Sequence, residues 1–182
     1  MSIKYDKLLV LDLDETLIYS TPRPLARNPD FWVLGYYVYK RPGVDEFLSA
    51  CMSWFEIAVW TAASSSYAHQ IVKNIFPDPT QLKFIFTGER CRLQLDRDSG
   101  VYQSIKSLKK IKIKGYSLKK VLAVDDKPES FSDNHGNGIL VKGYNGEAED
   151  RELILLLKYL KMIGQVKNVR KVKKKGWREK VK

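Results

Sequence analysis

The strongest indication of the fold is the segment Lys7-Leu-Leu-Val-Leu-Asp12-Leu-Asp-Glu-Thr16. Its apolar first half is short and uninterrupted, as expected of a β-strand buried on both faces of a sheet. Its second half places two carboxylates, Asp12 and Asp14, at the end of that strand. Close like charges are costly unless a cation joins them, and Mg²⁺ prefers oxygen ligands of this kind. The segment therefore predicts a magnesium site at the edge of a sheet; the alternative is a loop of solvated acids.

Further strands and helices alternate along the rest of the chain. Three apolar runs are also typical of buried strands, and they span residues 55–61, 121–125 and 138–142. Helical spacing of apolar residues predicts three helices, over residues 42–54, 64–76 and 153–163. Strands that alternate with helices favour an α/β, Rossmann-like fold, in which helices flank both faces of a parallel sheet.

Two segments interrupt this alternation. Residues 18–40 are rich in proline and aromatic residues, and Phe31 to Tyr39 is predicted to form a hairpin around Gly35. Residues 82–103 are predicted to be a small β insertion with strands over 82–87 and 91–95. Both segments follow core strands, near the edge where open α/β sheets bind ligands. We therefore expect a lid or a substrate groove there.

Composition limits the remaining possibilities. The chain has 182 residues and a net charge of +11, which fits one domain. The positive charge is concentrated in residues 104–120 and 167–182, so we divide the chain into a domain at 1–165 and a basic extension at 166–182. Two cysteines cannot form a disulfide scaffold, so we expect a reducing compartment, cytoplasmic or nuclear. The longest apolar run is too short to cross a bilayer, so we expect no membrane contact. Nothing in the sequence suggests a large exposed apolar interface, so we expect a monomer.

Other polar residues follow the predicted strands and point to phosphoryl transfer. Thr61 ends the second strand, and Asp125 and Asp126 end the third. Lys106 lies between them, at the start of a lysine-rich segment that is predicted to be helical. A nucleophile, a hydroxyl, an ammonium group and a pair of acids in this order could attack a phosphoryl group and stabilise its charge.

The motifs resemble those of the haloacid dehalogenase superfamily of phosphohydrolases. Most members carry glycine where this chain has Glu15. The form with glutamate resembles the branch that contains RNA polymerase II C-terminal-domain phosphatases and NLI-interacting-factor proteins, as do Lys40-Arg-Pro-Gly43, Trp60-Thr-Ala-Ala63 and Val121-Leu-Ala-Val-Asp-Asp-Lys-Pro128. The resemblance runs from about Lys7 to Ile163. It implies an aromatic flap hairpin and a small β insertion instead of a large cap.

The resemblance also implies roles for individual residues. Asp12 would attack phosphorus and form an aspartyl-phosphate, while Asp14 would act first as general acid and then as general base. Thr61 and Lys106 would hold the transferring oxygens. The substrate would also contact a second group of residues, namely Ala62, Phe31, Trp32 and Tyr36.

The same resemblance implies how Mg²⁺ would be held. Its ligands would be the Asp12 carboxylate, the Asp14 backbone carbonyl and the paired acids, with Asp126 as the direct ligand. Asp125 would instead face Lys106 or a metal-bound water. Lys109 is the alternative to Lys106 if the preceding loop is shorter.

These features predict a Mg²⁺-dependent phosphatase that acts on phosphoserine or phosphothreonine in a protein or peptide. The basic extension, with Trp177 as a residue that could stack on a base, is a candidate contact for nucleic acid or an acidic partner. It motivates a second hypothesis, a nucleic-acid 3′-phosphatase. A third is a phosphoprotein-binding module without catalysis.

Overall fold

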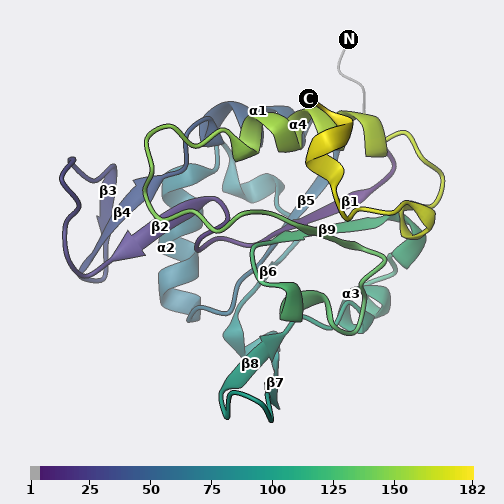
Figure 1. Cartoon of the computed structure of the whole chain (residues 1–182), viewed down its shortest axis with the longest axis horizontal. Helices are drawn as coiled ribbons and strands as arrows, with labels where there is room; N and C mark the ends of the chain where they lie inside the picture. The colour runs from purple at the N-terminus through teal and green to yellow at the C-terminus, as the bar shows by residue number, and fades with distance from the viewer. Residues whose placement is uncertain (1–4) are drawn as a thin grey trace.

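A parallel sheet of five strands forms the centre of the computed structural model, which describes residues 5–182 (Figure 1). Every pair of neighbouring strands in this sheet is parallel. In spatial order the strands are β10 (Gly138–Leu140), β9 (Val121–Asp125), β1 (Leu8–Leu11), β5 (Glu56–Trp60) and β6 (Ile85–Phe86). The predicted α/β class with a parallel sheet is confirmed.

Helices cover both faces of this sheet because its strands are apolar on both sides. In β1, Leu9 and Leu11 belong to one apolar cluster, and Leu8 and Val10 belong to another. The first cluster is completed by α1 (Val44–Trp54), α2 (Ser65–Ile75) and α4 (Glu152–Ile163). The second is completed by α3 (Lys109–Ile113) and the short 3₁₀ helix η4 (Pro128–Phe131). This arrangement accounts for the continuous apolar strands in the sequence.

The register of the sheet brings the predicted site residues to one edge. Leu11 is aligned with Val59 on one side and with Val124 on the other. The residues that follow these positions therefore emerge together, and they include Asp12 and Asp125. Crossover connections between parallel strands leave this carboxyl edge open, which is where such sheets bind ligands.

The aromatic segment forms a small antiparallel sheet beside the core. The predicted hairpin is present as β3 (Phe31–Val33) and β4 (Tyr36–Lys40). A third strand, β2 (Ile18–Thr21), pairs with the other side of β4 and was not expected from the sequence. We call this three-stranded sheet the flap.

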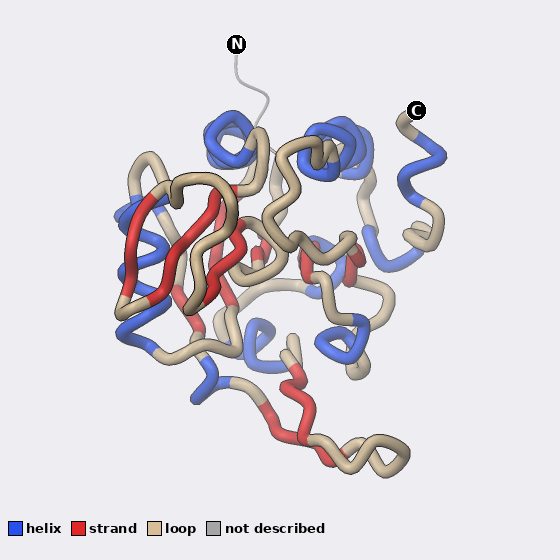
Figure 2. Tube along the Cα trace, turned by 60° about the vertical axis from the view of Figure 1, so that its left-hand side comes forward, coloured by secondary structure: helices blue, strands red, loops and turns tan. Residues whose placement is uncertain are grey.

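The second insertion differs from its expected boundaries. Its hairpin consists of β7 (Arg92–Leu95) and β8 (Tyr102–Ile105) and projects from the body (Figures 1 and 2). Placing residues 82–87 in the insertion was wrong, because β6 lies in the main sheet and pairs with β5. The helix predicted to start at Lys106 begins only at Lys109, since Lys106 directly follows β8.

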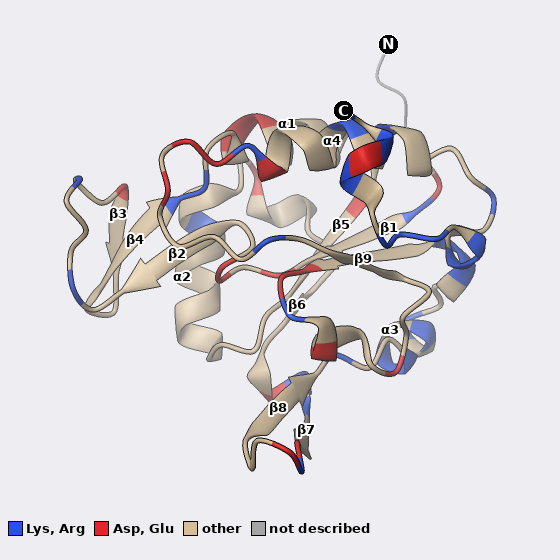
Figure 3. Ribbon diagram, in the orientation of Figure 1, with Lys and Arg blue, Asp and Glu red and all other residues tan. Residues whose placement is uncertain are grey.

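The C-terminal segment packs against the sheet edge. The indole N–H of Trp177 donates a 2.9 Å hydrogen bond to the carbonyl of Leu140 in β10, and the side chain is 2% exposed. Trp177 is thus not available to stack on a base. Figure 3 shows the lysine and arginine residues concentrated on this segment and around α3. The segment contains two of the remaining 3₁₀ helices, η5 (Val169–Lys171) and η6 (Trp177–Lys180); the others are η1 (Pro79–Gln81), η2 (Gly88–Arg90) and η3 (Leu118–Lys120).

None of the helices within residues 5–182 combines the length and the apolar character that crossing a bilayer requires.

Candidate active site

Lys106 bridges the end of β1 and the end of β9 at the carboxyl edge of the sheet, through contacts with Asp12 and Asp125. Its Nζ lies 2.5 Å from Oδ1 of Asp12 and 2.6 Å from Oδ2 of Asp125. All three side chains are less than a tenth exposed. Lys109, the alternative considered from the sequence, is exposed. The structure therefore places Lys106, and not Lys109, among the acids.

The charges in this cluster shift one another's protonation. Burial raises the pKa of Asp12 and the ammonium of Lys106 opposes that effect. For Lys106 the balance is reversed: burial would lower its pKa, but Asp12 and Asp125 together outweigh burial and raise it. Lys106 therefore remains protonated, and its charge favours an ionised Asp12.

Three carboxylates could share one cation. Single oxygens of Asp12, Asp125 and Asp126 all lie within 4.8 Å of one another. The Thr16 hydroxyl lies between two of these residues, 3.1 Å from Oδ2 of Asp12 and 3.5 Å from Oδ1 of Asp126. Burial, followed by the neighbouring Asp125, raises the pKa of Asp126 to about 6. An oxygen-only, crowded and partly buried donor set fits a hard divalent cation such as Mg²⁺.

The Asp14 carboxylate is held outside this cluster. Its Oδ1 accepts a 2.6 Å hydrogen bond from the Tyr67 hydroxyl and a 3.3 Å bond from Ser20. Burial raises the pKa of Asp14, and these two hydrogen bonds act against burial. Of Asp12 and Asp14, the structure brings only Asp12 to the acid cluster. The sequence analysis did not single out Tyr67, because its position in the predicted helix indicates only an apolar face.

A cavity of about 490 Å³ opens over these residues. Thr61 and Ala62 line it from the end of β5, and Tyr102 lines it from β8. Two residues expected to contact the substrate do not line this cavity: Phe31 packs against the apolar core, and the flap residue Trp32 is 56% exposed. Their contact with a substrate stays a prediction. Within residues 5–182, the walls of this cavity thus come mainly from the ends of the core strands and from the β7–β8 hairpin.

The loop after Thr61 is held by a close backbone approach. The Thr61 hydroxyl oxygen accepts a 3.0 Å hydrogen bond from the backbone N–H of Ala63. Gly88 packs against the same loop, and a Cβ at that position would lie 2.5 Å from the carbonyl oxygen of Ala62. Gly88 was also missed from the sequence, since only the packed structure shows which backbone it meets.

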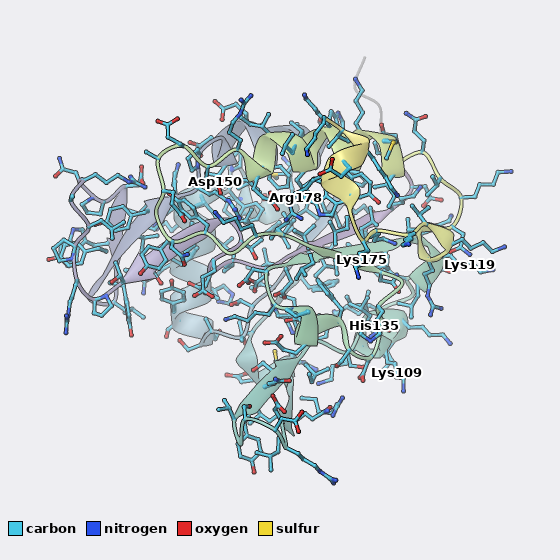
Figure 4. All side chains as sticks on the ribbon, viewed as in Figure 1. Lys109, Lys119, His135, Asp150, Lys175 and Arg178 are labelled. Carbon is cyan, nitrogen blue, oxygen red and sulfur yellow. The ribbon has the colours of Figure 1, made fainter. Side chains whose placement is uncertain are left out.

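Arg41 anchors the loop that carries Asp12 and Asp14. Its guanidinium is fully buried and pairs with Asp150 through two 2.8 Å contacts. It also donates a 2.9 Å hydrogen bond to the carbonyl of Thr16 and a 2.8 Å bond to that of Lys142. Asp150, labelled in Figure 4, lies in the loop before α4. Arg41 therefore links the loop that carries Asp12 and Asp14 to Lys142 and Asp150, which lie 101 and 109 positions after Arg41 in the sequence.

Comparison with known proteins agrees with this geometry. The family model described as NLI interacting factor-like phosphatase matches residues 7–170. A "CTD nuclear envelope phosphatase 1B" of Danio rerio is 31% identical over 181 residues, which cover 91% of this chain and 70% of the relative. A "Probable C-terminal domain small phosphatase" of Dictyostelium discoideum is 37% identical over 174 residues, covering 91% of this chain and 53% of the relative.

Other curated relatives are much longer. The chain spans 28% of a "CTD small phosphatase-like protein 2" and 34% of a "Nuclear envelope morphology protein 1". It therefore spans about half the length or less of several of the relatives it matches.

Solved structures show the same fold. The fission yeast RNA polymerase II CTD phosphatase Fcp1, in a variant bound to beryllium fluoride, has a TM-score of 0.65 at 20% identity. The match covers 87% of this chain and 62% of that one. A phosphoglycolate phosphatase assigned in Haemophilus somnus has a TM-score of 0.52 at 15% identity, covering 79% and 88%. With its motifs, its sheet and the family model in agreement, this chain belongs to the NLI interacting factor-like phosphatases of the haloacid dehalogenase superfamily.

Proposed function

We propose that the chain is a Mg²⁺-dependent phosphatase that hydrolyses phosphoserine or phosphothreonine in a protein or peptide through an aspartyl-phosphate. The observation that carries this proposal is the position of Lys106 between Asp12 and Asp125, beneath a cavity that Thr61 also lines. One nucleophilic carboxylate and two groups that bind phosphoryl oxygens are thus available on one surface.

In the first step, an oxygen of Asp12 attacks phosphorus and the bond to the leaving oxygen breaks. Asp14 protonates that oxygen, and the raised pKa that burial gives Asp14 favours the acid form that this step needs. In the second step Asp14, now a carboxylate, takes a proton from the water that attacks phosphorus; the bond between the Asp12 oxygen and phosphorus breaks, which releases inorganic phosphate and restores the Asp12 carboxylate. Lys106 and the Thr61 hydroxyl hold the transferring oxygens in both steps.

Mg²⁺ would be held by Asp12, Asp126 and the backbone carbonyl of Asp14. When bound, it would neutralise charge on the phosphoryl oxygens. Asp125 supports the site differently: its Oδ2 faces Lys106, while its Oδ1 accepts a 2.9 Å hydrogen bond from the backbone N–H of Lys127. These contacts are consistent with a residue that orients the ammonium group.

A protein substrate is favoured over a small metabolite by the walls of the cavity. The β7–β8 hairpin lines one side of it with exposed residues, including Val101 and Tyr102 at 60% and 66% exposure. Such a wall leaves room for a chain to enter and leave the site. The names of the relatives, among them a C-terminal domain small phosphatase, support the same substrate class. The cytoplasmic or nuclear location expected from the sequence stays a prediction, which imaging of a tagged chain in its host cell would test.

The test is hydrolysis of p-nitrophenyl phosphate and of a phosphoserine peptide, with Mg²⁺ and with excess chelator. We expect turnover that needs the metal and falls by several powers of ten in Asp12→Asn, as when other catalytic nucleophiles are removed. Asp98→Asn, an exposed acid in the hairpin turn, is the matched control and should keep full activity. Mass spectrometry of acid-quenched Asp14→Asn protein should show a phosphoryl adduct on Asp12.

Four results would contradict the proposal. Activity that survives chelation would exclude the requirement for Mg²⁺. Full activity in Asp12→Asn would exclude Asp12 as the nucleophile. A higher kcat/KM on a 3′-phosphorylated oligonucleotide than on the phosphopeptide would favour the nucleic-acid alternative. A protein that binds phosphopeptide without any turnover would instead be a binding module.

A further inference from the structure

A second cavity, which we call the basic recess, lies at the β10 edge of the sheet. Its volume is about 400 Å³. Aromatic rings and positively charged or imidazole side chains line it, and those that matter here are Phe131, His135, Lys174, Lys175, Trp177 and Arg178. The family model ends at residue 170, so the wall formed by residues 174–178 lies beyond the matched range. Figure 4 shows His135, Lys175 and Arg178 on the same side of the molecule.

Tight packing forms the recess in advance of any ligand. Trp177 is fixed by its hydrogen bond to Leu140 and stacks on Tyr159, with ring centroids 5.5 Å apart. On the other wall, Phe131 packs directly against Gly138, where a Cβ would lie 2.4 Å from the ring. A cavity with rigid walls costs little conformational entropy when it binds a ligand.

The charges in the recess are only partly neutralised. Lys174 is 7% exposed, and its Nζ donates to three carbonyls, those of Gly136, Val169 and Val172, at 2.7, 2.6 and 3.2 Å. Within residues 5–182, none of the carboxylates pairs with Lys174, Lys175 or His135. Arg178, by contrast, is paired with Glu152. The exposed ammonium of Lys175 can therefore donate to an anion in this cavity, and the positive charge of Lys174, which carbonyls solvate but do not neutralise, favours the same anion.

The basic recess and the active-site cavity share one wall. In the short helix η4, Pro128 and Phe131 line the recess, whereas Glu129 and Ser130 line the active-site cavity. A helical turn with its side chains is about 10 Å across. An extended peptide covers about 3.3 Å per residue, so about three to five residues would cross from one cavity to the other.

We infer that the basic recess binds an anionic side chain of the same substrate segment whose phosphorylated residue occupies the active site. The anion, a carboxylate or a second phosphate, would lie about three to five residues from the residue that reacts. This inference rests on the proposed function and adds a sequence preference to it. A peptide is favoured over nucleic acid because Trp177 is buried and offers no ring on which a base could stack.

The test compares phosphoserine peptides that differ at one position. Asp, Asn or phosphoserine is placed four residues before or after the reacting phosphoserine, and kcat/KM is measured at low and high salt. We expect the Asp and phosphoserine peptides to exceed the Asn peptide by about three- to tenfold on one side, mainly through KM, since charge-assisted contacts exceed neutral ones. Raising the salt concentration should reduce this ratio.

The decisive variant is Lys175→Glu, in which the Asp-to-Asn ratio should fall to one or below. Lys73→Glu makes the same charge change on the exposed surface of α2 and should keep the wild-type ratio. Equal kcat/KM for all peptides, or a ratio that persists in Lys175→Glu, overturns the inference while Asn-peptide turnover still supports the proposed function. The inference is also overturned if the peptides all react equally well and a single-stranded oligonucleotide binds more weakly to Lys175→Glu than to the wild type.

Discussion

The Tyr67 hydroxyl donates a 2.6 Å hydrogen bond to the Asp14 carboxylate, from a helix that lies 53 positions further along the chain. The Ser20 hydroxyl lies 2.8 Å from the same Tyr67 oxygen. Asp14 is thereby aimed away from the acid cluster that surrounds Asp12. Two carboxylates separated by one residue thus receive different environments, which is what an acid and a nucleophile need.

Tyr67→Phe should lower kcat by about tenfold, because an unanchored general acid is correctly oriented for less of the time. Steady-state kinetics on a phosphoserine peptide would measure this effect. Tyr5→Phe is the matched control, since it removes a tyrosine hydroxyl that donates to the Lys161 carbonyl. Unchanged kcat in Tyr67→Phe would show that the hydrogen bond from Tyr67 is not required to orient the Asp14 carboxylate.

Lys106→Gln should reduce kcat by about 10²–10³-fold, which is typical when one donor to a developing negative charge is removed. The reason is that Lys106 is the ammonium that faces both Asp12 and Asp125. Lys109→Gln changes a lysine three positions later that is exposed, and its activity should stay near wild type. If Lys109→Gln were the more damaging substitution, the choice of Lys106 over Lys109 as the phosphoryl-binding lysine would be wrong.

The acid cluster predicts a metal effect that can be measured without substrate. Mg²⁺ at 100 times its Kd should stabilise the folded chain by about 2.7 kcal/mol, seen as a higher Tm. Asp126→Asn removes one of the three clustered carboxylates, so its Tm should respond less to Mg²⁺. Asp98→Asn should respond like the wild type, and an equal response of all three proteins would place the metal elsewhere.

Gly88→Ala should reduce activity from a position outside the cavity lining. The new Cβ would lie 2.5 Å from the Ala62 carbonyl oxygen, so the loop that carries Thr61 must shift. We expect a loss of about 1–3 kcal/mol in unfolding free energy, as for other overpacked sites, together with reduced kcat/KM. Gly136→Ala meets its nearest atom at 3.4 Å and is the control. Wild-type kcat/KM in Gly88→Ala would show that the loop tolerates displacement.

The sequence predicted the centre of this structure better than its edges. The strands that lead to Asp12, Thr61 and Asp125 were recognisable because they are buried on both faces and therefore largely apolar. The strand β2 was not expected, and β6 was expected as part of a strand over residues 82–87 but not as a strand of the main sheet, since both pairings depend on distant partners rather than on local pattern. Short strands carry too few residues to show a period.

The supporting residues of the site were missed for a similar reason. The helical pattern shows that Tyr67 faces the core, but only the packing of α2 brings its hydroxyl to Asp14. Arg41 appeared in a motif, yet its pairing with Asp150 spans 109 positions. Glu15 shows what motif comparison adds: it adopts a left-handed backbone with φ of 59°, where most of the superfamily is expected to carry glycine.

Lys174 predicts how stability depends on pH. Burial, together with Lys180, lowers its pKa in the folded state to about 8, below the ordinary lysine value of 10.5. Between these two values the unfolded chain binds more protons than the folded chain, so this group makes the unfolding free energy rise with pH. Below pH 8 Lys174 is charged in both states, and the cost of burying its charge is fully present.

Denaturant unfolding of wild type and Lys174→Met at several pH values would measure this contribution, because other titrating groups cancel in the difference. The stability of the wild type relative to the variant should increase from about pH 8 towards pH 10.5. Lys173→Met, a change at the exposed neighbouring residue, should show a difference that stays flat over the same range. A flat difference for Lys174→Met as well would mean that the carbonyls of Gly136 and Val169 compensate fully for the burial of the ammonium.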